Sequence, residues 1–418
     1  MSAPEDPRTR QPLLLGLDLG AAKTCALAGI RRGGDIEIVG QGLAPSAGLR
    51  AGAVVDLEEA THRIGEAVTA ACQGAGRRAD SLWMSVTGPH LQCQHGEGEV
   101  HVAGGEVRQA DVDRALDAAA RIELPRGREV LHIVPRCYET DSADRVARPV
   151  GLTASRLVAH VSLVTASANT LDNGEKAAEA AGLQVEEMVM GPLATALSAL
   201  GQAHRRMGVL LVDIGAGTTD FALFSDDALE RCGSLPVAGE RLTRDLAAGL
   251  RVPLDAAEEL KLAYGCALPE SVDARELVTI PGAPLRARRP VLRRLIASVL
   301  EARLREIFGM VVKALDEPRW RLLAPGGAVL TGGTSQLPGI VELASDALAC
   351  PVTPATCLGT AGPLEVVRSP AHAACVGLLH YGAERGRDRP SPAAPADGLW
   401  RRLAEIARRL AARVRCRA

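Results

Sequence analysis

The stretches Leu13–Thr24 (LLLGLDLGAAKT) and Val209–Asp220 (VLLVDIGAGTTD) decide the fold of this 418-residue chain. Each is an apolar run that reaches an aspartate, Asp18 or Asp213, and continues into a turn of small residues with threonine. A further apolar run follows each turn, CALAGI in the first case and FALFS in the second. An internal repeat about 200 residues apart predicts two related halves that face each other. Strands alternate with helical patterns, as at 57–72, so each half is expected to be α/β.

The two turns have a composition that suits phosphate groups. Glycine and alanine after a strand let backbone N–H groups approach phosphate oxygens closely. An aspartate at the strand end supplies a carboxylate for Mg²⁺, usually through water, so Asp18 and Asp213 are the candidate metal and catalytic residues. Lys23 either contacts a phosphate or is exposed on the hairpin, and Thr218 and Thr219 offer hydroxyl donors. The candidate phosphate-binding residues are Gly20, Ala21, Ala22, Lys23, Thr24, Gly215, Ala216, Gly217, Thr218 and Thr219.

A third apolar run, Ala328–Thr331, leads into Gly332, Gly333, Thr334 and Ser335. Glycines at this point would let an adenosine lie flat against the backbone, so Gly332, Gly333 and Ser335 join the candidate site. A single turn of this kind is as typical of an ordinary β-hairpin. Two turns at corresponding places, with a third motif after another strand, predict nucleotide binding.

Composition and charge exclude several other functions. Aromatic residues are 2% of the chain and the formal net charge is −2, which argues against base stacking and against a nucleic-acid partner. The cysteines form no CxxC pair, so a structural zinc site is not expected. The first residues lack an apolar secretion core, and no apolar run approaches the ~20 residues of a membrane span. The pattern indicates a cytosolic chain, unless another feature holds it to a membrane.

The end of the chain is such a feature. A stretch rich in Pro, Ala and charge follows Gly382, which is typical of a flexible linker. A helical pattern then places apolar residues on one stripe: Leu399, Leu403, Ile406, Leu410 and Val414, flanked by Trp400. Seven arginines, among them Arg401, Arg402, Arg408 and Arg409, stand against one carboxylate, which gives a local charge of +6. A basic amphipathic helix on a tether favours an anionic membrane surface. A helix docked on its own body and an RNA-binding tail are the alternatives.

At this level of detail the sequence resembles the FtsA family of actin-like bacterial cell-division proteins, within the actin, Hsp70 and sugar-kinase superfamily. GLDLGAAKTCALAG resembles the first phosphate motif, VDIGAGTTDFALF the second and VLTGGTSQLPG the adenosine motif. Blocks such as GAVVDLEEA, PVGLTASRLVAHVSLV and HAACVGLLHYG carry the resemblance along nearly the whole chain. The resemblance implies an actin-like clamp of four subdomains with bound ATP and Mg²⁺. It adds Gly239, Glu240, Glu258 and Lys261 to the nucleotide site, the last two for the ribose hydroxyls unless they form only a surface ion pair.

The resemblance also implies the domain boundaries. A segment of different texture at 89–163, with short alternating strands and one helix at 109–121, stands where the IC-type, SHS2-like α+β subdomain of this family is expected. The expected division is 12–88, 164–203 and 366–382 for subdomain IA; 204–239 and 288–365 for IIA, with a long helix over 288–315; 240–287 for IIB; 383–397 for the linker; and 398–418 for the amphipathic membrane helix.

The function implied is that of a membrane-tethered, self-assembling adaptor. Such a protein would anchor FtsZ filaments to the inner face of the cytoplasmic membrane at the septum and help to recruit later division proteins. Gly191 and Pro192 stand where Hsp70-like ATPases place the Glu that positions water, and Glu186 and Glu187 upstream are expected on the surface, so ATP hydrolysis is expected to be slow at most. The rivals are a PilM-like pilus-assembly protein, which is not expected to end in such a tail, and a true Hsp70-type or sugar-kinase enzyme.

Overall fold

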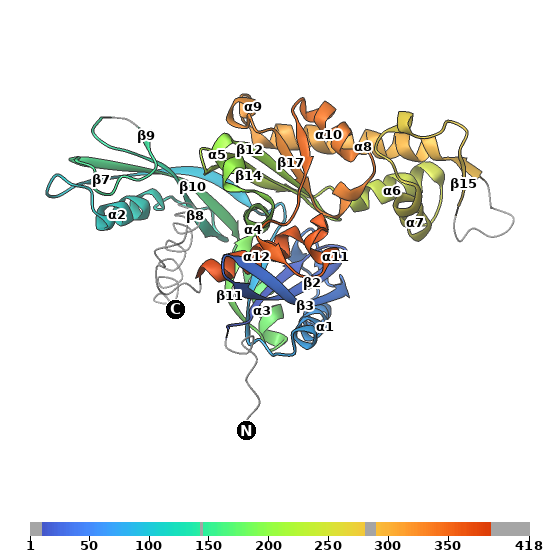
Figure 1. The fold of residues 1–418 in the computed structure, drawn as a ribbon, viewed down its shortest axis with the longest axis horizontal. Coiled ribbons are helices and arrows are strands. Elements are labelled where there is room, and N and C mark those ends of the chain that lie inside the picture. The colour runs from blue at the N-terminus through green and yellow to red at the C-terminus, as the bar shows by residue number, and fades with distance from the viewer. Residues whose placement is uncertain (1–10, 143–144, 281–289, 386–418) are drawn as a thin grey trace, which may run out of the picture.

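The computed structural model describes residues 11–142, 145–280 and 290–385. Two sheet-containing halves form the body of the molecule, and an arm extends from each end of it (Figure 1). One arm carries α2 (Gln109–Ala119) and β7 (Gln92–His101), and the other carries α6 (Gly239–Leu250) and α7 (Leu254–Tyr264). The membrane helix predicted at 398–418 and residues 386–397 of the predicted linker lie outside the described residues. Residues 383–385, predicted to begin the linker, instead form the last turn of helix α12 (Ala373–Arg385). None of the described helices is long and apolar enough to cross a membrane.

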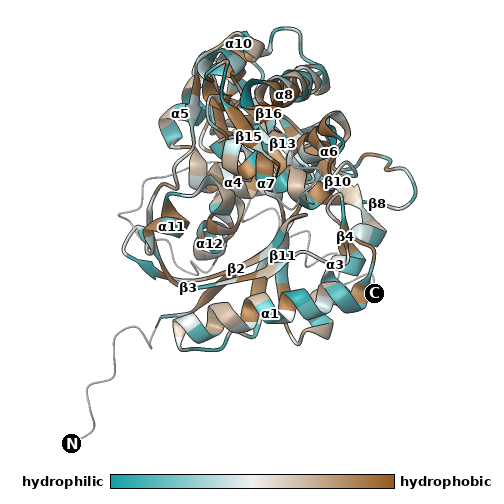
Figure 2. Cartoon of the chain, turned by 90° about the vertical axis from the view of Figure 1, so that its right-hand side faces the viewer, coloured by the Kyte–Doolittle hydropathy of each residue, from teal (hydrophilic) through white to brown (hydrophobic). Residues whose placement is uncertain are grey.

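The first half contains a six-stranded sheet in the order β11-β6-β1-β2-β3-β19. Its strands are β1 (Leu14–Leu19), β2 (Lys23–Arg32), β3 (Asp35–Pro45), β6 (Ser81–Val86), β11 (Gln184–Met190) and β19 (Thr360–Ala361). Helices α1 (Leu57–Ala75) and α3 (Ala168–Ala180) cover one face of this sheet. Figure 2 shows α1 beneath β2 and β3, with hydrophilic and hydrophobic residues alternating along it as expected for a half-buried helix.

The second half contains a five-stranded sheet in the order β14-β13-β12-β17-β18. Its strands are β12 (Val209–Ile214), β13 (Thr219–Ser225), β14 (Ala228–Leu235), β17 (Ala328–Thr331) and β18 (Val352–Pro354). Strand β12 pairs antiparallel with β13 and parallel with β17, as β1 pairs antiparallel with β2 and parallel with β6. Five strands of the first sheet therefore repeat the order of the second, and the prediction of two related halves is confirmed.

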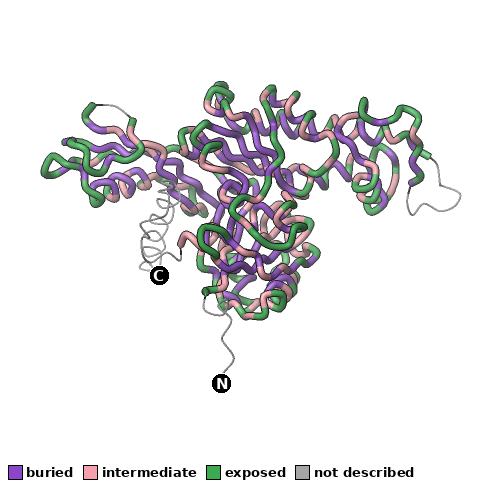
Figure 3. The backbone as a smooth tube through the Cα atoms, viewed as in Figure 1, coloured by how far each residue is buried: buried purple, intermediate pink, exposed green. Residues whose placement is uncertain are grey.

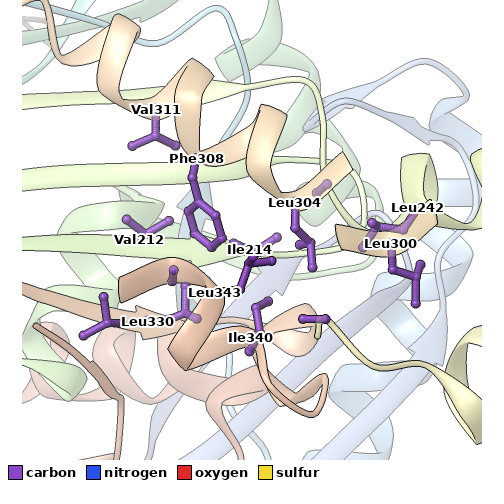
Figure 4. Close-up of a cluster of buried hydrophobic side chains, with 14 of the residues drawn as sticks. Val212, Ile214, Leu242, Leu300, Leu304, Phe308, Val311, Leu330, Ile340 and Leu343 are labelled. Carbon is purple, nitrogen blue, oxygen red and sulfur yellow. The ribbon is translucent and has the colours of Figure 1, made fainter. Parts of the chain in front are cut away.

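Strand β12 is apolar apart from Asp213, because both faces of its other residues are buried. Leu210, Val212 and Ile214 face one cluster, under α8 (Arg293–Leu315) and α10 (Ile340–Leu348). Figure 4 shows Val212 and Ile214 against Phe308 and Leu304 of α8 and Leu343 of α10. Each such side chain contributes roughly 1.5–3 kcal/mol by leaving water.

The opposite face of β12 packs toward the first half. Val209 and Leu211 share a cluster with Leu193 and Ala196 of α4 (Gly191–Ala199). Helix α4 in turn packs on α12 (Ala373–Arg385), which lies against β1 and β2 of the first sheet. These two helices occupy the centre of the molecule in Figure 1, where the tube of Figure 3 is almost continuously buried. They fix how the two phosphate turns face each other.

The segment predicted as an insert is a separate module with its own sheet, in the order β7-β10-β8-β9. Its further strands are β8 (Arg128–Glu139), β9 (Arg145–Val146) and β10 (Arg156–Ser167), and α2 covers one face. Strand β7 begins at Gln92, where its first residues pair with the end of β10. The module contacts the second half through β14, where the Ser162 hydroxyl donates to the Leu229 carbonyl.

The long helix predicted over 288–315 begins later than expected. Pro290–Leu292 form strand β16, which pairs with β15 (Leu277–Thr279), and α8 starts at Arg293. A proline at the start of a short edge strand is tolerated because its missing N–H removes no ladder bond. The pairing places the first residues of this segment in the arm with α6 and α7, before the helix enters the body.

Buried His132 of β8 gives a prediction on stability. Its Nε2 accepts a hydrogen bond from the Met190 N–H at 3.0 Å, and burial lowers its pKa to about 3. An unfolded histidine titrates near ~6.5, so below that pH the unfolded chain binds more protons and the free energy of unfolding falls as pH falls. His132→Gln keeps an acceptor without the titration. Urea unfolding at several pH values should then show a pH dependence weaker by up to ~1.4 kcal/mol per pH unit between ~4 and ~6. An unchanged dependence would contradict this role.

Candidate functional site

A cavity of about 510 Å³ lies between the two halves, beside both phosphate turns. Most of the predicted site lines it: Asp18, Gly20, Ala21, Ala22, Lys23, Asp213, Gly215, Ala216, Gly239, Glu258, Lys261, Gly332 and Gly333. The two turns have the same geometry, since the Gly20 N–H donates to the Lys23 carbonyl at 3.1 Å and the Gly215 N–H to the Thr218 carbonyl at 3.0 Å. The repeat seen in the sequence therefore produces two equivalent turns on opposite walls of one cavity.

The aspartates that precede the turns are held by hydroxyl groups. The Ser85 hydroxyl donates to Asp18, and the Thr195 hydroxyl donates to Asp213 at 3.0 Å. Burial raises the pKa of Asp18, against the hydrogen bond from Ser85 and the charge of Lys23. Burial, reinforced by the charges of Asp220 and Asp18, raises the pKa of Asp213 to about 8.

A third carboxylate, missed by the sequence analysis, lies on the neighbouring strand. Asp220 is paired with Asp213 across β12 and β13. Burial raises the pKa of Asp220 to about 7, and its Oδ1 atom has no hydrogen-bond partner among the described residues. Burial without a nearby cation favours the protonated form of these carboxylates, and a bound cation would stabilise their charged form.

These carboxylates fit the surroundings of a nucleotide-bound Mg²⁺. This ion keeps several waters and takes one or two carboxylates together with phosphate oxygens. Asp18 and Asp213 stand on opposite walls at the phosphate end of the cavity, where they would face such an ion. No group of three or more His, Cys, Asp or Glu side chains in the described parts of the chain is arranged to hold a metal by itself.

The third motif closes the cavity from the second half. Gly332 has φ +89°, and a Cβ atom there would lie 2.4 Å from Asp213 Oδ1 and from the Ile214 carbonyl oxygen, so only glycine fits. Thr334, which lines the cavity, donates its hydroxyl to the Gly215 carbonyl at 2.7 Å. The third motif is thereby bonded directly to the second phosphate turn.

Glu258 and Lys261 both line the cavity and also form an ion pair at 2.7 Å. Lys261 donates to the Gly239 carbonyl at 3.2 Å and to the Thr243 hydroxyl at 2.9 Å, and Thr243 donates to Glu258. The pair thus joins the two helices of the arm at the mouth of the cavity. The structure contains the ion pair and also places both side chains at the cavity, and their contact with the ribose stays a prediction.

Several predicted residues point elsewhere. The Thr219 hydroxyl donates to the Val237 carbonyl at 2.6 Å and its side chain is fully buried, so the donor role expected for it is wrong. The Thr218 hydroxyl donates to Asp220, and the Ser335 hydroxyl donates to the Gly332 carbonyl. Thr24 is buried within β2. These four residues do not line the cavity, and neither do Gly217 and Glu240, which face a second compartment.

Two groups of cavity residues were missed by the sequence analysis. One is an apolar wall at the end away from the aspartates: Leu242, Leu262, Leu337 and Pro338. Leu262 is 76% exposed on α7, which only the structure shows. The other group lies beside the first turn and comes from the segment that leads into α12: Pro370, Ala371 and Ala374. His372 follows and lies 3.5 Å from Lys23 Nζ, which places Lys23 at the cavity wall.

Glu187 is not the surface residue that the sequence suggested. It accepts a hydrogen bond from the Tyr381 hydroxyl at 2.6 Å and forms an ion pair with Arg385, at the end of α12. Gly191 and Pro192 begin α4, and Asp18, Asp213 and Glu258 are the carboxylates that line the cavity. Glu187 therefore binds the last described helix and does not reach the phosphate turns.

Comparisons with known proteins agree with the fold and with the inserted module described above. Family models described as "Cell division protein FtsA" and "SHS2 domain inserted in FTSA" match residues 210–377 and 88–165. Cell division protein FtsA of Pseudomonas aeruginosa is 38% identical over 377 residues, 90% of each chain. The Escherichia coli protein of that name is 33% identical over 384 residues, 90% of this chain and 91% of the relative.

Solved structures resemble the fold at lower identity. The PilM–PilN type IV pilus biogenesis complex gives a TM-score of 0.64 at 19% identity, over 89% of this chain and 99% of that one. MreB5 of Spiroplasma citri bound to ADP gives 0.55 at 15%, over 91% and 99%. The fold is thus that of the actin-like ATPases, with an SHS2 domain inserted in the first half. Within that class, the chain belongs to the FtsA family, as identity above 30% over nine-tenths of its length shows.

Proposed function

We propose that this chain binds ATP with Mg²⁺ between its halves and acts in cell division as a self-assembling link between FtsZ filaments and the membrane. The observation that carries the proposal is the cavity with two equivalent phosphate turns, in a chain of the FtsA family. The adenosine would lie between the apolar wall and Gly332–Gly333, and the triphosphate would reach the turns. Asp18 and Asp213 would face the ion that the phosphates carry.

Membrane attachment is assigned to the basic amphipathic sequence at 398–418, which would lie on the inner face of the cytoplasmic membrane at the septum. Actin-like contacts between copies of the chain would build the filament, and later division proteins would join it. The pilus-assembly rival shares the fold, as the PilM likeness shows. The relatives above 30% identity and the basic tail favour the division role over it.

Flotation with anionic vesicles tests the proposal. Purified FtsZ polymers should float with vesicles when the full chain and ATP are present, and should stay at the bottom when either the chain or the vesicles are left out. FtsZ that never floats with the chain would overturn the linking role. If the chain floats and FtsZ stays at the bottom, the chain binds the membrane but does not link it to FtsZ.

ATP turnover separates this proposal from the enzyme rival. We expect tight binding with turnover well below the ~1–10³ s⁻¹ of ordinary enzymes, because no glutamate stands beside the phosphate turns among the residues that line the cavity. Phosphate release under saturating Mg-ATP measures the rate. A rate of tens per second would show that another group, such as Asp220, positions water efficiently.

A further inference from the structure

A second compartment of about 480 Å³ lies beside the nucleotide cavity. Ala21 and Ala216 line both, so the two phosphate turns form the wall between them. The tips of the turns touch, since a Cβ atom on Gly217 would lie 2.6 Å from the Cβ of Ala21. A contact between small residues of the two turns therefore separates the second compartment from the nucleotide cavity.

The lining of this compartment is positively charged in a chain whose formal net charge is −2. Three guanidinium groups, from Arg50, Arg241 and Arg244, stand against the one carboxylate of Glu240, a formal net charge of +2. Guanidinium groups bind phosphate oxygens through paired hydrogen bonds, so a cluster of them suits a phosphate better than a carboxylate or a neutral molecule.

The arginines are free to take such a ligand. Arg50 makes no side-chain hydrogen bond or ion pair with another described residue, and Arg241 and Arg244 form only i, i+4 pairs on the surface of α6, at 3.3 Å to Asp245 and 3.7 Å to Glu240. Exposed pairs of this kind are weak and exchange readily with a bound anion.

Arg50 stands on a hairpin that is held in place. Strands β4 (Leu49–Arg50) and β5 (Ala53–Val54) are joined through Ala51, whose φ of +47° is unusual for a residue with a side chain. A Cβ atom on Gly52 would lie 2.0 Å from the Thr87 carbonyl oxygen, so the hairpin packs directly on the loop after β6. The structure thus fixes the backbone that carries Arg50 at the edge of the compartment.

The arginines come from both halves of the molecule. Arg50 belongs to the first half, whereas Arg241 and Arg244 lie on α6, in the arm of the second half. We propose that this compartment binds a phosphate anion and that the bound anion bridges the two halves beside the phosphate turns. The lining of the second compartment is also linked to the second turn, because the Thr219 hydroxyl, at the start of β13, donates to the carbonyl of Val237, a lining residue.

Titration of the full chain with inorganic phosphate tests the site, at constant ionic strength and with saturating Mg-ADP. The triple variant Arg50→Gln, Arg241→Gln, Arg244→Gln should bind phosphate at least about tenfold more weakly. The control variant Arg78→Gln, Arg294→Gln, Arg319→Gln removes the same charge, with one residue in the first half and two in the second. It should stay within about twofold of the wild type, and both variants should keep their affinity for Mg-ADP.

Phosphate can come from solution or from the bound nucleotide, and a second arm separates these sources. The second arm is a single turnover with γ-labelled ATP. If the wild type retains the label and the triple variant loses it, the phosphate in the compartment is the one cleaved from ATP. If only added phosphate binds, the ligand is the free anion from solution. Wild-type protein that binds no phosphate, or a triple variant that binds like the wild type or like the control, overturns the proposal. The phosphate titration is repeated without nucleotide, so that its result does not depend on the proposed ATP binding. A failure of the proposed ATP binding would appear separately, as absent Mg-ADP binding.

Discussion

Asp213→Ala is expected to weaken Mg-ATP binding at least about a hundredfold, ~2.7 kcal/mol, while the protein stays folded. The carboxylate faces the cavity, accepts one hydrogen bond from Thr195 and fills no part of the apolar core. Its loss removes the charge that would organise the cation on the phosphates. Isothermal titration with Mg-ATP measures the effect, and unchanged affinity would refute the assignment of Asp213.

Two further measurements separate charge from shape at this position. Asp213→Asn keeps the size of the side chain and should lose as much affinity as Asp213→Ala. Because the pKa of Asp213 is raised to about 8, its proton must leave as the cation binds, and wild-type affinity should rise between pH ~6 and ~8. That rise should be smaller in Asp213→Asn. Asp346→Ala, which removes an exposed carboxylate of α10, is the matched control and should bind like the wild type.

Deletion of residues 399–418 should release the protein from anionic vesicles and leave nucleotide affinity unchanged, because the proposed linker separates the two functions. Leu403→Glu alone should release most of it. A charge at the centre of a spanning helix costs ~2.5–3.5 kcal/mol on insertion scales, an upper guide for a helix at the interface. Vesicle co-sedimentation measures the bound fraction, which should also fall with added salt because each arginine near an anionic surface contributes ~1 kcal/mol.

Ala412→Glu is the matched control for this variant. It introduces the same charge on the opposite side of a helix from Leu403, nine residues away at 100° per residue, so it should retain much more vesicle binding. Neutralising Arg408 and Arg409 should weaken binding to anionic vesicles more than to neutral ones. Full co-sedimentation of the truncated protein would show that the anchor lies elsewhere in the chain.

The sequence alone determined the two halves, the insert and the core of the site. Strand, aspartate and small-residue turn are local features, and their repetition placed Asp18 and Asp213 at equivalent points before the halves were seen together. The change in texture at 89–163 marked the SHS2 domain, which the family model places at 88–165. Local hydrophobic periodicity suffices for such conclusions because each element must bury its own apolar face.

Only the tertiary structure decided which side chains reach the cavity. Thr219 reads as a phosphate donor in sequence, yet the return of the chain at Val237 takes its hydroxyl. Pro370 and Ala371 line the cavity because α12 packs between the halves. Arg50 lines the second compartment together with residues of α6 because the two halves are packed against each other. Pro370 lies 350 positions from Gly20 of the first turn, and Arg50 lies 191 positions from Arg241 of α6. No local pattern encodes such distances, since they are fixed by how α4 and α12 hold one sheet against the other.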